Sequence, residues 1–173
     1  HELLDTVLSF ERSSHPGLRF MAYYDASLPD IEADRDKLHQ VFLNLVRNAS
    51  EACPADGRVR VLTRHCAHWE LAGTNLDPTR RYILVSIEDE GPGIPEELRK
   101  NIFKPLFSTK KQGTGLGLSI SFRLVESHGG QLRYQPSERS GACFQVILPE
   151  SQSESLEENS PNFVYQDLRK EIS

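Results

Sequence analysis

The stretch KQGTGLGL, residues 111–118, places three alternating glycines directly before a helical pattern over residues 117–128. Gly113, Gly115 and Gly117 permit positive φ angles and close approach of another group. The helix that follows offers free N–H groups and the positive end of its dipole. Together these features favour a phosphate ligand. The alternative is a flexible linker. The stretch is not a Walker loop, since the motif GxxxxGK[ST] is absent.

Basic residues gather just before these glycines. Between Arg99 and Lys111 there are five basic residues and no acidic ones, although the chain carries a formal net charge of -5. This local positive charge matches an anionic ligand, and Lys110 and Lys111 are candidates to contact terminal phosphates. The alternative is a solvated basic surface.

A second candidate segment is YILVSIEDEGPGIP, residues 82–95. Alternate apolar residues from Ile83 to Ile87 lie on one face of a strand, and Asp89 continues that row. A buried carboxylate needs a donor, and the exocyclic amine of a purine would serve. Gly91 and Gly93 then let the backbone pass close to a flat ligand. The alternative is an ordinary turn after the strand, since DEGPG also favours turns.

A third candidate lies on a helix that Asp34 caps and that runs to about Ala52. Asn44 and Asn48, four residues apart, share one edge of its apolar face. Their amide oxygens are suited to a hard cation such as Mg²⁺. Alternatively, they are polar residues at the boundary of the core.

The remaining segments predict one α/β domain over residues 1–150. Periodicity and turn residues predict a first helix (1–13), strands (18–25, 58–65), a hairpin loop (67–81), a short helix (95–103) and a closing hairpin (131–150). Between residues 150 and 160 there are four acidic residues, four serines and no basic residue. We therefore expect residues 151–173 to form a flexible, acidic, Ser-rich tail.

Composition excludes several classes of protein. With 173 residues and 38% hydrophobic content, the chain can bury one sizeable core. A net charge of -5 and a pI near 5.7 disfavour a nucleic-acid partner. No apolar run approaches the roughly 20 residues that span a bilayer, and the first residues lack a basic-then-apolar signal pattern, so we expect no membrane contact by this fragment. Three scattered cysteines fit reduced thiols and a cytoplasmic location.

The order of these segments resembles the catalytic ATP-binding domain of sensor histidine kinases, which are related to the gyrase, heat-shock chaperone and mismatch-repair ATPases. The matching segments are LNLVRNASEA (43–52, N box), DEGPGIP (89–95, G1 box), IFKPLFSTK (102–110, F box) and GTGLGLSI (113–120, G2 box). The sequences NASEA and FSTK are most similar to those of the nitrogen-regulation class. The resemblance spans residues 1–150 and implies an α+β fold, a two-layer sandwich of the Bergerat type. In it, a mixed, mostly antiparallel sheet packs against about three helices.

The resemblance also implies ATP and Mg²⁺ as cofactors and a set of site residues. Asn48 would coordinate Mg²⁺, and Asn44, Asn48 and Lys110 would be the catalytic residues. Asp89 would hold the adenine amino group. The other implied ATP-binding positions are Gly91, Gly93 and Ile94 at the base, Phe103 and Phe107 as lid anchors, and Lys111, Gly113, Thr114, Gly115, Leu116, Gly117 and Leu118 beside Lys110 at the phosphates.

One departure from the pattern of the related ATPases favours a kinase over an ATPase. Gyrase-like and chaperone-like ATPases place a glutamate base one turn before the metal-binding Asn, where this chain has Asn44. An amide cannot take a proton from water, so slow hydrolysis is expected. The γ-phosphate would go to a histidine on a separate dimerisation domain, since no H-E-[IL]-[RK] stretch occurs here. The expected partners are that domain and a response regulator, with this fragment monomeric. The alternatives are a nucleotide-sensing regulatory module without phosphotransfer and a gyrase-like ATPase.

Overall fold

The computed structural model describes residues 1–110, 113–137 and 141–151. Its helices and strands, in chain order, are α1 (Glu2–Ser14), β1 (Arg19–Tyr24), α2 (Arg35–Ala52), β2 (Arg58–His65), the 3-10 helix η1 (His68–Leu71), β3 (Tyr82–Asp89), α3 (Glu96–Arg99), α4 (Gly117–Ser127), β4 (Gln131–Pro136) and β5 (Ala142–Pro149). The predicted long helices and strands are confirmed. The short helix predicted over residues 95–103 is a single turn, Glu96–Arg99, and η1 lies in the segment predicted as a hairpin loop.

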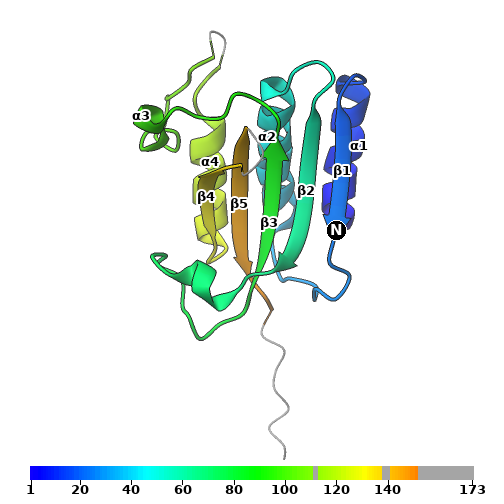
Figure 1. The fold of residues 1–173 in the computed structure, drawn as a ribbon. Helices are drawn as coiled ribbons and strands as arrows, with labels where there is room; N and C mark the ends of the chain where they lie inside the picture. The colour runs from blue at the N-terminus through cyan, green and yellow to red at the C-terminus, as the bar shows by residue number, and fades with distance from the viewer. Residues whose placement is uncertain (111–112, 138–140, 152–173) are drawn as a thin grey trace, which may run out of the picture.

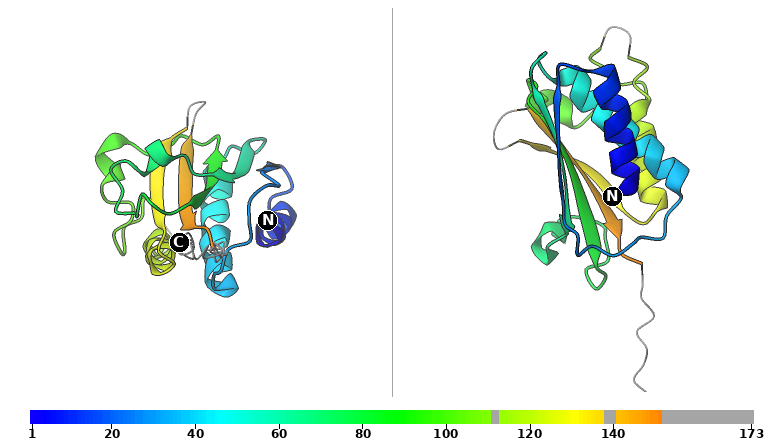
Figure 2. Two further views of the ribbon diagram at one scale, coloured as in Figure 1. Left: turned by 90° about the horizontal axis from the view of Figure 1, so that it is seen from below. Right: turned by 90° about the vertical axis from the view of Figure 1, so that its right-hand side faces the viewer.

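One five-stranded sheet organises the described chain, with strand order β1-β2-β3-β5-β4 (Figure 1). β1 pairs with β2 in parallel, and the other three pairings are antiparallel. Helices α1, α2 and α4 lie together on one face of this sheet (Figure 2). The predicted fold class, a mixed and mostly antiparallel sheet under three long helices, is confirmed.

Local chemistry explains where α2, the central helix, begins and ends. The Asp34 carboxylate accepts a hydrogen bond of 3.1 Å from the backbone N–H of Lys37. This side-chain cap satisfies a donor that the first turn leaves without a helical partner. At the other end, the Cys53 N–H still bonds to the Ala49 carbonyl before Pro54 stops the helix. The start and end predicted from the sequence are both confirmed.

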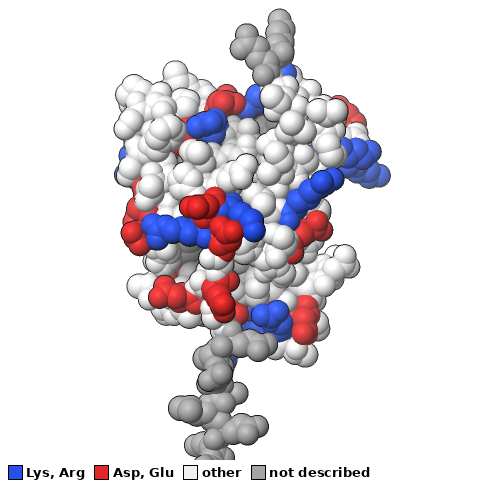
Figure 3. All heavy atoms as spheres, turned by 180° about the vertical axis from the view of Figure 1, so that it is seen from behind, with Lys and Arg blue, Asp and Glu red and all other residues white. Residues whose placement is uncertain are grey.

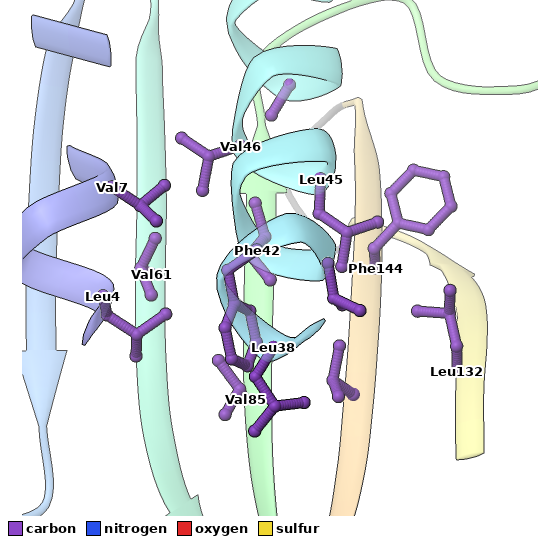
Figure 4. Close-up of a cluster of buried hydrophobic side chains, with 14 of the residues drawn as sticks. Leu4, Val7, Leu38, Phe42, Leu45, Val46, Val61, Val85, Leu132 and Phe144 are labelled. Carbon is purple, nitrogen blue, oxygen red and sulfur yellow. The ribbon is translucent and has the colours of Figure 1, made fainter. Parts of the chain in front are cut away.

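The main core lies between the three helices and the sheet. Figure 4 shows the part of it beneath α1 and α2. It contains completely buried residues from every layer, among them Val7, Leu45, Val46, Val61 and Ile87. Burying such side chains contributes about 1.5–3 kcal/mol each, which makes this layer the principal source of stability. α2 lies at its centre, so its polar edge has a fixed position above the sheet.

A smaller apolar cluster covers the opposite face at one end of the sheet. It consists of Leu71, Tyr82, Leu84 and Ile147, which are all buried. The connection from β2 to β3 lies over these residues and contains η1. An ion pair between Arg64 and the buried Glu70 holds the connection in place, and the guanidinium of Arg64 lowers the pKa of Glu70. The sequence predicted this hairpin loop, but it did not predict that β3 would be buried on both faces.

The helix-bearing side of the molecule carries charges of both signs. Lys and Arg alternate with Asp and Glu over this face, without a broad patch of one sign (Figure 3). Within the described ranges, no helix has the length and apolar character needed to cross a membrane. The predicted acidic tail lies outside the described residues from position 152 onwards.

Candidate functional site

Two connections, the one that follows β3 and the one that joins α3 to α4, lie at the end of the sheet where α2 ends (Figure 1). Gly91 follows β3 and lies so close to Ala52 that a Cβ there would be 2.6 Å from the Ala52 carbonyl oxygen. Gly117, at the start of α4, is packed against the Asn44 amide in the same way. Lys110 reaches Asn48 with its ammonium group. The segments singled out from the sequence are therefore neighbours in space.

Asp89 is the last residue of β3 and is only 2% exposed. Its Oδ1 accepts two backbone hydrogen bonds, from Gly91 N–H at 2.8 Å and from Ala142 N–H at 3.2 Å. Burial raises the pKa of Asp89, while these two donors act in the opposite direction. Within the described residues both donors reach the same oxygen, so Oδ2 remains the acceptor that a ligand amine can use.

Close packing and, at Gly93, a positive φ of 73° account for the glycines that follow Asp89. A Cβ on Gly91 would lie 2.9 Å from Asp89 Oδ1, and one on Gly93 would lie 3.0 Å from the Gly141 carbonyl oxygen. A side chain at either position would push the turn away from the carboxylate. Ile94 continues this turn, half-buried against the main core, and its N–H bonds to the Tyr134 hydroxyl at 3.4 Å.

Aromatic residues attach the basic segment to the core. The Phe103 ring lies 5.3 Å from that of Phe122 on α4 and 6.4 Å from that of Phe144 on β5. Phe107 is half-buried against the same core, whereas Leu106 is 75% exposed. The structure thus places both predicted anchors, Phe103 and Phe107, where they can hold the segment that ends at Lys110.

The glycine loop is shaped by contacts with this basic segment. Of its three glycines only Gly115 has a positive φ, at 66°, and a Cβ there would lie 2.7 Å from the Phe107 backbone nitrogen. Gly113 instead lies against Ser108, where a Cβ would overlap the hydroxyl. Positive φ and close approach were both expected reasons for these glycines, and positive φ applies to Gly115 alone. Close approach explains Gly113 and Gly117.

The start of α4 faces the polar edge of α2. Asn44 Nδ2 donates to Ser121 Oγ at 3.0 Å, and a Cβ on Gly117 would overlap Asn44 Oδ1. Among the described residues no side chain caps this end of α4, and its first turn contains no acidic residue. Its leading N–H groups thus remain available to an anion beside Asn44. Thr114 and Leu116 are exposed just before the helix, and Leu118 packs against the core.

Lys110 lies over the same edge of α2. Its Nζ donates to Asn48 Oδ1 at 3.4 Å and forms an ion pair with Glu51. Among the predicted site residues, the structure therefore joins Asn44 to Gly117 and Asn48 to Lys110. Gly91, which is hydrogen-bonded to Asp89, approaches the end of α2 at Ala52. Lys111 was also predicted, and it lies outside the described residues.

Sequence reasoning missed several residues that complete this region. Glu51 lies one helical turn after Asn48, so its place on the same edge was detectable from spacing. Ser121, which fixes the Asn44 amide, is a buried hydroxyl on α4. Gly141 and Ala142 contact Asp89 across the β3–β5 pairing, a contact that no local pattern in the sequence indicates.

A separate hollow of about 440 Å³ lies at the other end of the sheet, among His65, Arg81, Tyr82 and Glu150. His65 Nδ1 and Glu150 Oε1 are 2.7 Å apart there. In the part of the chain that the structure describes, no group of three or more His, Cys, Asp or Glu residues is arranged to hold a metal ion. The segments that meet along α2 are therefore the stronger candidate for the functional site.

Comparison with known proteins agrees with this geometry. A family model described as histidine kinase-, DNA gyrase B-, and HSP90-like ATPase matches residues 33–152. The chain belongs to this ATPase family. The matched range begins just before α2 and extends past the end of β5, so it contains every segment of the candidate site.

The relatives that this chain matches are named as kinases. The NtrB sensory histidine kinase/phosphatase of Azospirillum brasilense is 38% identical over 152 residues, which cover 86% of this chain and 38% of that protein. Sporulation kinase C of Bacillus subtilis is 39% identical over 119 residues, covering 69% of this chain and 25% of the relative. The resemblance to sensor histidine kinases, the nitrogen-regulation class included, is confirmed. The chain spans about two-fifths of the length of its NtrB relatives.

Solved structures show the same architecture as this ATPase domain. The catalytic domain of histidine kinase ThkA superposes with a TM-score of 0.72 at 33% identity, covering 86% of this chain and 91% of that one. The mycobacterial sensor histidine kinase MprB gives a TM-score of 0.70 at 28% identity, covering 86% and 92%. The chain thus has the fold of a histidine kinase catalytic ATP-binding domain.

Proposed function

We propose that residues 1–150 form the phosphoryl-donating domain of a sensor histidine kinase, which transfers the γ-phosphoryl group of ATP to a histidine on a separate dimerisation domain. The observation that supports this most is the meeting of Asn48, Lys110 and the start of α4 along one edge of α2. A response regulator would then receive the phosphoryl group from that histidine. The proposed location is the cytoplasm, where ATP and such regulators are found.

The proposed adenine contact is made by Asp89. Its Oδ1 is occupied by two backbone donors, so Oδ2 can accept a hydrogen bond from the exocyclic amine of adenine. Because the carboxylate is buried, water competes poorly for that bond. A nucleobase without a hydrogen-bond donor at this position would leave the buried Asp89 Oδ2 unpaired. This cost would make the site selective for adenine.

The phosphates would lie between the start of α4 and Lys110. Uncapped N–H groups and the helix dipole favour the negative charge of the triphosphate. The Lys110 ammonium can accompany the γ-phosphate and offset the charge that moves during transfer. Gly115 would keep the loop backbone close to Phe107, and so keep Lys110 near α2.

The donor set near Asn48 fits Mg²⁺. An amide oxygen is a hard ligand, and magnesium in nucleotide sites takes most of its other ligands from phosphates and water. Asn48 would hold the ion and Asn44 would support the neighbouring phosphate contacts. When bound, the ion would neutralise phosphate charge. The Lys110 contact at 3.4 Å shows that Asn48 Oδ1 already accepts a cationic partner.

Transfer to a histidine is favoured over hydrolysis because of Asn44. Its amide is held by Ser121 Oγ at 3.0 Å, one helical turn before Asn48. A neutral amide has no basicity with which to activate water. A gyrase-like ATPase needs a base at this position, so rapid steady-state release of phosphate would contradict the proposal.

Replacing Asn48 by Ala should remove most of the magnesium dependence of nucleotide binding. We expect Mg²⁺ to strengthen binding of a non-hydrolysable ATP analogue to the unaltered chain, and this gain to fall by at least about tenfold in Asn48→Ala. Isothermal titration calorimetry with and without Mg²⁺ measures both values. Asn75→Ala, at an exposed position in the β2–β3 connection, is the matched control and should behave like the unaltered chain.

Phosphotransfer itself needs the missing partner. The chain should label a dimerisation domain from an NtrB-type relative with the γ-phosphate of ATP, at a single histidine. Tight nucleotide binding without transfer to any such domain would instead identify a nucleotide-sensing module.

A further inference from the structure

A cation already occupies the edge of α2 where the metal would bind. The Lys110 ammonium contacts Asn48 Oδ1 at 3.4 Å and is ion-paired with Glu51 Oε2. Asn48 and Glu51 are three residues apart on one helix, so their oxygens point to the same side. An amide oxygen and a carboxylate oxygen together are also a ligand pair suited to a hydrated divalent ion.

We propose that Glu51 is a positioning residue that makes nucleotide affinity depend on the divalent cation, an inference that rests on the proposed function. Before nucleotide binds, its carboxylate holds the Lys110 ammonium over Asn48. When a nucleotide with its metal enters, the ammonium moves to the terminal phosphate, and the Glu51 carboxylate then faces the hydrated metal.

The exchange is easy because the ion pair is exposed. The side chains of Lys110 and Glu51 are 44% and 42% exposed, and pairs of this kind contribute little to stability. The ammonium can therefore leave Glu51 without disturbing the core. The charge of Glu51 remains after the exchange and acts on whatever occupies the site.

That charge has opposite effects on metal-free and metal-bound nucleotide. Without a divalent ion, the carboxylate stands near a highly negative triphosphate and repels it. With the ion present, the same carboxylate attracts the metal and offsets that repulsion. Glu51 thus disfavours nucleotide that arrives without its metal, whereas Asn48 favours the nucleotide that carries it.

Glu51→Gln separates these effects, because it keeps the shape of the side chain and removes the charge. We expect metal-free binding of a non-hydrolysable ATP analogue to tighten by about fivefold, while binding in excess Mg²⁺ changes little. The ratio of the two dissociation constants, measured by calorimetry, should fall accordingly. Glu126→Gln, at an exposed position near the end of α4, is the matched control and should leave the ratio unchanged.

A second variant tests whether the ammonium occupies the cation position. In Lys110→Gln, Mn²⁺ alone should bind the nucleotide-free chain about fivefold more tightly than it binds the unaltered chain, as measured by electron paramagnetic resonance. Adding Glu51→Gln should cancel that gain. Equal Mn²⁺ affinity in all three proteins would overturn the competition between Lys110 and the metal.

The outcomes distinguish the inference from the proposed function. If the unaltered chain binds no adenine nucleotide with or without Mg²⁺, the proposed function fails and the role of Glu51 fails with it. If the unaltered chain shows magnesium-dependent binding and Glu51→Gln keeps the same ratio, only the inference is wrong.

Discussion

Replacing Asp89 by Asn should lower the affinity for an ATP analogue by about 100-fold while the fold remains intact. The reason is the direction of one hydrogen bond. Asn can keep its Oδ1 on the N–H groups of Gly91 and Ala142, as Asp89 does. Its Nδ2 must then point to the ligand, so two donors face each other where adenine presents its amine. Calorimetry at saturating Mg²⁺ measures the loss.

Asp89→Ala is the informative comparison for this prediction. It removes the same ligand contact, but it also leaves two buried N–H groups without an acceptor, which costs about 1–3 kcal/mol for each group. We therefore expect Asp89→Ala to unfold at clearly lower urea concentration and Asp89→Asn to unfold near the unaltered chain. Burial raises the pKa of Asp89, so the neutral amide avoids the cost of burying a charge. Retained nucleotide affinity in Asp89→Asn would show that Asp89 does not hold the base.

Gly141→Ala should reduce both stability and nucleotide binding, although Gly141 itself is not one of the proposed ligand contacts. Its φ is 88°, and a Cβ there would lie 2.7 Å from Asp89 Oδ1 and would overlap the Asp89 carbonyl oxygen. The obstruction is backbone, which cannot rotate away as a side chain could. We expect a loss of about 2–4 kcal/mol in the free energy of unfolding. We also expect nucleotide affinity to weaken by about tenfold or more, because Asp89 must shift.

Gly73→Ala isolates the part of this cost that comes from backbone strain. Gly73 has a similar φ of 75°, but a Cβ there would meet nothing within 4 Å. Its loss should be about 1–2 kcal/mol, with nucleotide affinity unchanged. Equal destabilisation by Gly73→Ala and Gly141→Ala, as measured by urea unfolding, would mean that crowding against Asp89 contributes nothing.

Most of the fold was predictable because local signals agreed with tertiary packing. Asp34 as a cap and Pro54 as a stop define α2, and the alternation along β2 and β3 matches their pairing. The burial of β3 on its second face was not predictable, because it depends on the connection from β2 folding back over Leu84. A polar, Gly- and Pro-containing loop has no periodic pattern that would indicate this.

The candidate site was predictable only where its residues recur as motifs. Asn48, Asp89 and Gly115 stand in recognisable segments, so the sequence named them and the structure shows what surrounds them. Glu51 had a detectable spacing but no evident partner until Lys110 was placed beside it. The effect of Gly141 on Asp89 arises from pairing between strands more than 50 residues apart, which a pattern along the chain does not encode.

The contacts of α2 with the turn after β3 and with the α3–α4 connection also determine which changes of length the protein can accept. Each residue added to a helix turns everything beyond it by about 100°. A single insertion between Asn44 and Asn48 would rotate one amide off the shared edge, so that Asn48 and the start of α4 would no longer lie on the same side of α2. An insertion between Gly73 and Thr79 would lengthen an outlying connection at the far end of the sheet and leave that edge in register.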